Sequence, residues 1–340
     1  MRGSRMASEM AEQPAVLGHL IGRRSELVQR IRSVLPQELA GIVLLARGSS
    51  DHAAIYGRYV LELASGRPVA LAAPSLHTLY GAKIDYRGYL AIAVSQSGRT
   101  PEIITVLQRM KDGGARTLVV TNESDSPLGE SGDALLDVRA GVEEAVPATK
   151  TFTAQLLAFS VIAEALGEVP WLDRDWDHLP EHVATVLDDT DPVEDAAKQM
   201  SEARGLISVG RGFLYSVALE AALKLKETTA LLAEGYSSAD LRHGPIAVAT
   251  KGLPALAFVA PGPAAADMEE VVAWLEQRGA LVFSVSELPG AELPLPVGLP
   301  EPLVTVPATV RAQQLAFTLA LIRGVDPDVP SGLNKVTMTR

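Results

Sequence analysis

The chain has 340 residues, of which 47% are hydrophobic and 21% charged, a balance that predicts a folded chain large enough for two domains. Its formal net charge of −11 argues against nucleic-acid or anionic-membrane partners, and its lack of cysteine excludes disulfides and thiolate chemistry. No apolar run is long enough to span a membrane, so we expect a cytoplasmic protein. His and carboxylate residues show no metal-ligand spacing, and we predict no metal and no cofactor.

Residues 1–21 form an N-terminal segment in this interpretation. Its first ten residues, MRGSRMASEM, resemble a cloning remnant with Met6 as an alternative start. We assign these ten residues no part in the fold.

Apolar runs then alternate with helical patterns over residues 22–170, which is typical of a parallel sheet with helices on both faces. The run GIVLLARGSS, which begins at Gly41, predicts a buried strand, and DHAAIYGRYVLELA predicts the helix after it. A second strand, YLAIAVSQSG, begins at Tyr89 and leads into the helical pattern PEIITVLQRMKDGG. The run ARTLVVTNE is the third strand of this first subdomain.

The second of these strands ends in a polar stretch, Ser95–Gly98, and Thr100 precedes the next helix. Pro and Glu follow Thr100, and both suit the first turn of a helix. Hydroxyl groups beside a helix N-terminus are typical of an anion-binding loop. A plain turn is the alternative.

A repeat relates the two halves of the chain at an offset of 164 residues, which places Gly41 on Gly205. The same offset aligns LAIAV with PALAF and TLVVTNE with LVFSVSE, without a gap. We therefore predict an α/β fold of two tandem subdomains, each a doubly wound, flavodoxin-like parallel sheet flanked by helices. The second subdomain covers residues 191–325, after a Pro- and Asp-rich linker at 171–190 and before a C-terminal tail at 326–340.

The repeat also serves as an internal control for the polar loop. Ser95, Gln96 and Ser97 fall on the residues VAP of the second half, whereas Gly98 falls on Gly262. The second copy keeps the turn glycine and lacks the hydroxyls, which favours a ligand over turn chemistry alone.

The helical pattern VALEAALKLKETT carries Glu220, Lys224 and Glu227 at i, i+4 and i+7, so the three share one helix face. Taken alone, this spacing favours an exposed ladder of ion pairs. His243 precedes a Gly-Pro turn, which favours a fixed loop display, although a lone His is more often structural. Lys335, near the C-terminus, is by default a solvated surface residue.

Five motifs together resemble the sugar isomerase (SIS) family: ARGSSDHA, SQSGRTPE, VPATKTFTAQ, ALEAALKLKETTALLAEGYSSADLRHGPIA and GLNKVT. The resemblance runs from about residue 10 to the C-terminus. It is closest to the isomerase half of glucosamine-6-phosphate synthase and to stand-alone glucosamine-6-phosphate deaminases. It implies two SIS subdomains and a homodimer with active sites shared between subunits.

The resemblance also implies roles for individual residues. The match of Glu227 moves a proton between C1 and C2 of an open-chain sugar, with Lys224 as a nearby cation and Glu220 in support. His243 would open the sugar ring from the neighbouring subunit, and Lys335 would form a Schiff base with a ketose. The implied substrate-binding residues, which include the phosphate loop, are Ser49, Ser50, Ser95, Gln96, Ser97, Thr100, Val146 and Ala148.

Three residues depart from the synthase pattern: Arg99 replaces an acidic residue, Ala148 a serine and Asn334 an alanine. These departures leave the phosphate loop intact and indicate a different sugar or reaction. The chain also lacks the cysteine nucleophile with which the synthase releases ammonia from glutamine.

We therefore predict an isomerase/deaminase without a glutaminase domain, which converts glucosamine 6-phosphate to fructose 6-phosphate and ammonia. Three alternatives stay open. They are a deglycase of fructosamine 6-phosphates, a dehydratase or lyase of an N-acetylamino sugar 6-phosphate, and a non-catalytic sugar-phosphate sensor.

Overall fold

The structure is a computed structural model, and it describes residues 2–335. Contacts divide the described chain into two units. The first-sheet unit contains residues 16–142 and 154–169, and the second-sheet unit contains residues 2–15, 143–153 and 170–335. The predicted subdomain ranges, 22–170 and 191–325, remain predictions about the organisation of the chain.

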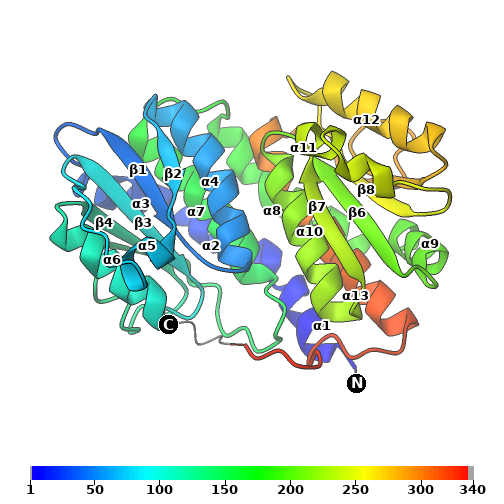
Figure 1. Cartoon of the computed structure of the whole chain (residues 1–340), viewed down its shortest axis with the longest axis horizontal. Helices are drawn as coiled ribbons and strands as arrows, with labels where there is room; N and C mark the ends of the chain where they lie inside the picture. Colours follow the sequence, from blue (N-terminus) through cyan, green and yellow to red (C-terminus); the bar gives the residue numbers. More distant parts are fainter. Residues whose placement is uncertain (1, 336–340) are drawn as a thin grey trace. The chain divides into compact units, whose positions relative to one another are not determined.

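The first-sheet unit is built on five parallel strands in the order β2-β1-β3-β4-β5 (Figure 1). Strands β1 and β3 are almost completely buried, which explains why they read as apolar runs in the sequence. Helices α2 and α7 begin in residues of the other unit. The elements are α2 (Gln13–Gly22), α3 (Arg24–Arg32), β1 (Gly41–Leu45), α4 (Ser49–Ser65), β2 (Val69–Leu71), α5 (Pro74–Thr78), β3 (Tyr89–Ser95), α6 (Pro101–Asp112), β4 (Arg116–Thr121), β5 (Ala134–Asp137) and α7 (Lys150–Leu166).

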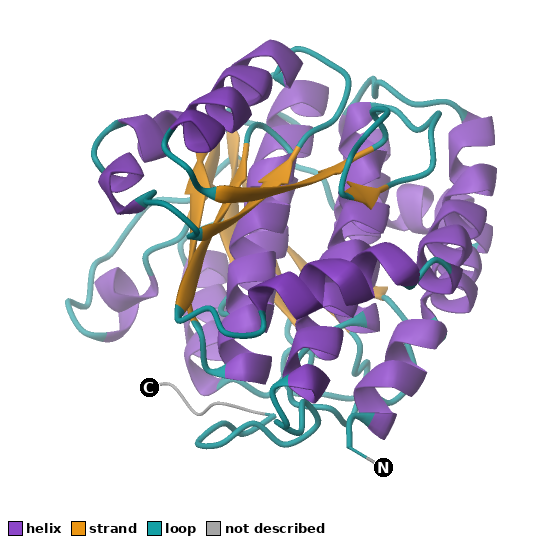
Figure 2. Ribbon diagram, turned by 90° about the vertical axis from the view of Figure 1, so that its right-hand side faces the viewer, coloured by secondary structure: helices purple, strands orange, loops and turns teal. Residues whose placement is uncertain are grey.

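The second-sheet unit also has five parallel strands, in the order β10-β9-β8-β6-β7. Figure 2 shows helices on both sides of the strands. The elements are α1 (Ser4–Ala11), α8 (Asp173–Asp188), α9 (Asp191–Met200), β6 (Gly205–Gly210), α10 (Leu214–Thr229), β7 (Leu232–Ser237), α11 (Ser238–Arg242), the 3-10 helix η1 (Pro245–Val248), β8 (Pro254–Phe258), α12 (Ala265–Gln277), β9 (Leu281–Ser286), β10 (Leu293–Pro294) and α13 (Glu301–Ile322).

The two sheets have the same topology, as the repeat predicts. Reading the second sheet from β7, its order β7-β6-β8-β9-β10 corresponds strand by strand to β2-β1-β3-β4-β5. The offset extends to the helices, because α6 begins at Pro101 and α12 at Ala265, 164 residues later. The predicted fold class, an α/β chain with two doubly wound parallel sheets, is confirmed.

Equivalent helices also pack on equivalent strands. In the first-sheet unit, Ile103, Val106 and Met110 of α6 join β1 and β3 in a buried apolar cluster. In the second-sheet unit, Met268 and Val271 of α12 do the same with β6 and β8. These clusters hold the carboxyl end of each central strand against the start of the next helix.

The N-terminal residues are an ordered part of the second-sheet unit. Met6 in α1 is completely buried, and the backbone N–H groups of Arg5 and Met6 donate to the Asp328 carboxylate at 3.0 and 2.8 Å. The prediction that the first ten residues take no part in the fold is therefore wrong. The carboxylate that accepts from its first turn lies 322 positions away, so the sequence gives no local capping signal for this helix.

Candidate active site

The predicted phosphate loop lies at the carboxyl edge of the first sheet. Strands β1 and β3 are parallel neighbours, so the start of α4 and the stretch Ser95–Thr100 meet at the same edge. After β1 the chain continues to β2, toward one edge of the sheet, and after β3 it continues to β4, toward the other edge. Such a switch point is where doubly wound sheets place their ligands. Ser50 and Ser95 are both nearly buried there, while Ser97 and Thr100 are partly accessible.

The loop has a tight turn at Gly98, whose φ of 61° lies in the left-handed region. The Ser95 hydroxyl accepts a hydrogen bond from the Gly98 N–H at 3.2 Å, and the Ser97 hydroxyl accepts one from the Arg99 N–H at 3.3 Å. Each hydroxyl keeps its own proton for donation to a ligand. Within residues 2–335, no side chain caps the N-terminus of α6 at Thr100, so its N–H groups are free of a side-chain acceptor.

An ion pair beneath the loop was missed in the sequence. Glu102, in the first turn of α6, is only 5% exposed, and its carboxylate accepts a hydrogen bond from Nε of Arg47 at 2.9 Å. Nη2 of Arg47 lies 2.9 Å from the same oxygen. Arg47 follows β1, 55 positions away, and the pairing of β1 with β3 brings the two together. The guanidinium compensates the carboxylate, which would otherwise repel an anion at the same helix end.

The three charged residues of α10 form a compact cluster. The Lys224 ammonium lies 3.3 Å from Glu220 Oε1 and 2.5 Å from Glu227 Oε2. The side chains of Glu220 and Lys224 are 1% exposed, whereas that of Glu227 is 18% exposed. The alternative of an exposed ion-pair ladder is therefore wrong, and Glu227 is the member that solvent reaches most easily.

Electrostatics keep the lysine of this cluster charged. Burial by itself lowers the pKa of Lys224, but the charges of Glu220 and Glu227 outweigh it and raise the pKa above its usual range. An accessible carboxylate next to a buried cation can take up and return a proton while its position stays fixed.

His243 follows α11, near the carboxyl end of β7, and its side chain is exposed. Gly244 after it has a φ of 123°, which only glycine adopts readily, and Pro245 starts η1. His243 therefore lies at the start of a loop, and its fixed display stays a prediction. Its contact with a neighbouring subunit stays a prediction.

Lys335 is in the same unit as the loop that carries Val146 and Ala148. Its ammonium donates to Glu143 Oε2 at 2.8 Å and to the carbonyl oxygen of Ala145 at 2.7 Å. Lys335 is thus not a freely solvated lysine, since its side chain is 23% exposed and Glu143 is fully buried. Glu143 was missed in the sequence because the neighbouring Glu144 looks identical there, although that side chain is 60% exposed.

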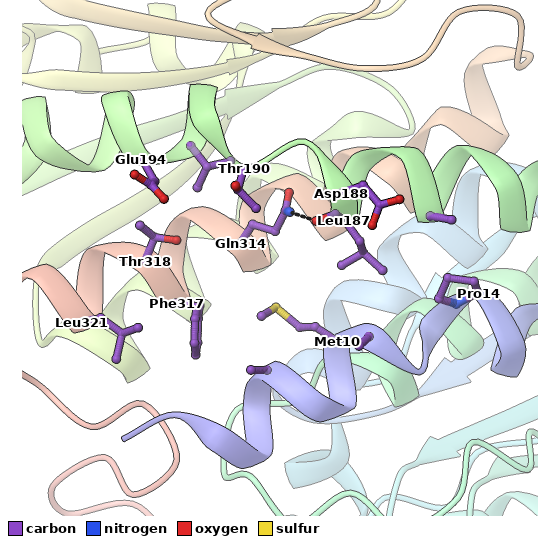
Figure 3. A pocket seen from close by; sticks show the side chains of 14 residues that line it. Met10, Pro14, Leu187, Asp188, Thr190, Glu194, Gln314, Phe317, Thr318 and Leu321 are labelled. Carbon is purple, nitrogen blue, oxygen red and sulfur yellow. Dashed lines mark hydrogen bonds between the residues drawn. The ribbon is translucent and has the colours of Figure 1, made fainter. Parts of the chain in front are cut away.

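The second-sheet unit also has a groove of about 530 Å³, which is separate from the predicted site residues. Figure 3 shows its lining, with Met10 of α1, Leu187 of α8 and Phe317 of α13 around the opening. None of the predicted site residues lines it.

Comparison with known proteins decides the family. The sequence model of the SIS domain matches residues 40–165 and 199–294, which include both central sheets. The chain belongs to the SIS domain family.

This SIS chain is also similar to longer proteins. It is 33% identical to the isomerizing glutamine–fructose-6-phosphate aminotransferase of Methanothermobacter thermautotrophicus, over 97% of this chain and 56% of that protein. The corresponding enzyme of Gloeobacter violaceus is 34% identical over 97% and 58%. The SIS chain thus spans slightly more than half the length of these curated relatives.

Solved structures share the fold. A protein of Silicibacter pomeroyi DSS-3, provisionally assigned as a phosphosugar isomerase, is 32% identical with a TM-score of 0.86, over 96% of this chain and all of that one. The glucosamine-6-phosphate deaminase of Thermotoga maritima is 24% identical with a TM-score of 0.74, over 95% and 99%. The predicted resemblance to the SIS family is confirmed.

Two further features bear on function. Among residues 2–335, no group of three or more His, Asp or Glu side chains is placed to hold a metal ion. In the same part of the chain, no helix combines the length and the apolar content needed to cross a membrane.

Proposed function

We propose that the chain is a phosphosugar isomerase that acts as a deaminase and converts glucosamine 6-phosphate to fructose 6-phosphate and ammonia. The observation that carries this proposal is the buried Lys224 between Glu220 and Glu227, with Glu227 as the one partly exposed member of the three. Such a cluster is costly to bury and has no obvious structural use on a helix that already packs well. The names of the relatives, which act on fructose 6-phosphate or glucosamine 6-phosphate, support the substrate class.

In this proposal, the Ser95–Ser97 hydroxyls, Thr100 and the N-terminus of α6 bind the 6-phosphate, with Ser49 and Ser50 at the start of α4 completing the loop. The phosphate provides binding energy remote from the reacting carbons and fixes the orientation of the sugar. Val146 and Ala148 contact the sugar itself. The exposed Arg99 and the small Ala148 distinguish this site from that of the synthase.

The proposed reaction moves one proton and releases one amine. His243, from the neighbouring subunit of a homodimer, assists opening of the sugar ring. Glu227 then takes the proton from C2 of the open-chain aldehyde while the aldehyde oxygen gains a proton from solvent, which gives an enolamine. It returns its proton to C1 while the amine nitrogen loses one to solvent, which gives an imine at C2. Water adds to the imine carbon, ammonia leaves, and fructose 6-phosphate remains. The Lys224 ammonium, which donates a hydrogen bond to Glu227 Oε2, keeps that carboxylate oriented.

The test is an assay of ammonia release on glucosamine 6-phosphate, with fructose 6-phosphate measured in parallel. We expect stoichiometric formation of both. Glu227→Gln should lower turnover by about two to four orders of magnitude, the usual contribution of a general base, while inorganic phosphate still binds. The surface variant Glu269→Gln on α12 is the matched control and should keep full activity.

Three outcomes would contradict the proposal. Full activity of Glu227→Gln would remove Glu227 from the reaction. Tight sugar-phosphate binding without turnover would indicate a sensor. Turnover of an N-acetylated sugar phosphate or of a fructosamine 6-phosphate instead would keep the fold and the phosphate loop but replace the substrate.

A further inference from the structure

The loop from Glu143 to Thr149 is organised around one buried carboxylate. Oε1 of Glu143 accepts hydrogen bonds from the N–H groups of Thr149 and Thr151 at 2.9 and 3.2 Å. Oε2 accepts one from the Thr151 hydroxyl at 2.7 Å. Glu143 thereby satisfies the N-terminus of α7 and closes the loop that carries Val146 and Ala148.

The same Oε2 atom also receives Lys335. The distance from the Lys335 ammonium to Glu143 is 2.8 Å, and a second hydrogen bond of 2.7 Å ends on the Ala145 carbonyl. Burial by itself raises the pKa of Glu143, but the charge of Lys335 and the hydrogen bonds from Lys335 and the two threonines outweigh it, so the pKa is lowered. Glu143 is therefore an anion, and its charge faces the lysine.

Two acidic residues of the N-terminal region hold the loop from outside. Glu9 Oε1 accepts hydrogen bonds from the N–H groups of Glu144 and Ala145, and the carboxylate of Glu12 lies 2.6 Å from the buried Lys150 ammonium. Met10, which Figure 3 shows at the neighbouring groove, packs in an apolar cluster with Ala145. These contacts tie the backbone around the Lys335 ammonium to the N-terminal region.

We propose that Glu143 is a positioning residue that holds the Lys335 ammonium and the Val146–Ala148 loop in one fixed arrangement. The proposal rests on the proposed function and deepens it by one assignment: the Lys335 amine takes part in the reaction at the ketose carbonyl, the role that the resemblance to the SIS family implies. Glu143 touches no reacting atom in this scheme. It acts through the lysine, whose amine must be in the same place at each turnover and must leave its carboxylate before it can attack a carbonyl carbon.

The test measures the reactivity of Lys335 directly. The folded protein is treated with trinitrobenzenesulfonate near pH 8, and the modification rate of Lys335 is followed by peptide mass spectrometry. Glu143→Gln keeps an acceptor oxygen for Thr149 and Thr151 but turns an N–H₂ group toward the ammonium. We expect Lys335 to react about tenfold faster in this variant, the equivalent of one lost charge-assisted hydrogen bond.

Two variants separate positioning from general loosening of the loop. Glu12→Gln neutralises a carboxylate of the same region that contacts Lys150 and not Lys335, so the rate at Lys335 should stay within about twofold of wild type. Glu143→Asp keeps the charge and should restore slow modification in large part. An unchanged rate in Glu143→Gln, or an equal increase in Glu12→Gln, would overturn the proposal.

The wild-type protein provides a second measurement that is independent of how any variant folds. Lys335 should react more slowly than the exposed Lys251 in the folded state and equally fast in urea. Equal rates in the folded state would also overturn the proposal.

Activity is measured last. If the chain deaminates glucosamine 6-phosphate, Glu143→Gln should lower kcat about tenfold or more and leave phosphate affinity unchanged. If the wild-type chain does not deaminate glucosamine 6-phosphate, the proposed function fails. The modification rate of Lys335 still decides the role of Glu143.

Discussion

The carboxyl edges of the two sheets have the same backbone plan and different chemistry. In the first sheet, Ser95, Gln96 and Ser97 precede Gly98, and the loop carries hydroxyls beside an uncapped helix. In the second, the matching turn at Gly262 follows apolar residues, and the carboxylate of Glu301 occupies the space beside it. A Cβ atom on Gly262 would come within 2.5 Å of Glu301 Oε2.

The helices that follow the first strand of each copy, α4 and α10, also differ: here the second copy carries the charged side chains at the matching positions. The offset places Glu220, Lys224 and Glu227 of α10 on Tyr56, Val60 and Leu63 of α4. The first copy thus has the hydroxyl-bearing loop and none of these three charges on α4, while the second has the charged cluster on α10 and the Glu301 carboxylate beside its matching turn. In the proposed function, a duplicated scaffold keeps the same strand order in both copies, and binding falls to the first copy while acid–base chemistry falls to the second.

Removing the cation from the charged cluster should have the largest effect. Lys224→Met leaves two carboxylates facing each other in a buried site, so we expect a loss of about 3–5 kcal/mol in the free energy of unfolding, measured with urea. The neutral triple variant Glu220→Gln, Lys224→Met, Glu227→Gln is the control. It copies the uncharged state of α4 and should lose less stability than the single variant. A single variant as stable as wild type would show that the charges are not coupled.

Removing one hydroxyl from the Ser95–Gly98 loop tests the predicted anion binding of the first sheet. Ser97→Ala deletes one donor to a dianion and should weaken binding of inorganic phosphate about tenfold, as measured by calorimetry. Pro261→Ala, the matching change in the second copy, should leave the affinity unchanged. Equal effects of the two variants, or none from Ser97→Ala, would remove the distinction between the two edges.

The repeat explains why so much of the fold could be predicted. Strands β1 and β3 are buried on both faces, so they read as apolar runs, and Gly41 and Gly205 mark the same point in both copies. The start of helix α6 could be predicted from the Pro and Glu in its first turn. The start of helix α1 could not, because what fixes its N-terminus is Asp328, at the far end of the chain.

The same division between local and distant signals holds at the site. The spacing of Glu220, Lys224 and Glu227 follows from helix geometry, but their burial depends on what packs over α10, which the spacing does not show. Glu143 sits in an irregular loop without periodicity, so only its contact with Lys335 reveals it. The pair Arg47–Glu102 could have been predicted from the sequence, because parallel pairing of β1 with β3 brings the residues after β1 to the start of α6.

The smallest effect we predict concerns Glu301. Burial raises the pKa of its carboxyl, so the folded state binds the proton more tightly than the unfolded state does. The stability that this group contributes is therefore fully present below its unfolded pKa, near 4.5, and is lost as the pH rises through the higher folded pKa. At neutral pH the ionised carboxyl costs stability.

Glu301→Gln removes that cost, so we expect a slightly higher Tm at pH 7 and no gain below about pH 4, where wild type is already protonated. Scanning calorimetry at both pH values measures the difference. Glu276→Gln, an exposed position on α12, is the control and should change Tm at neither pH. A lower Tm for Glu301→Gln at pH 7 would mean that the charge of Glu301 stabilises the second edge. The carboxylate would then be an integral part of that turn, and the second copy would hold its own anion where the first is open to one.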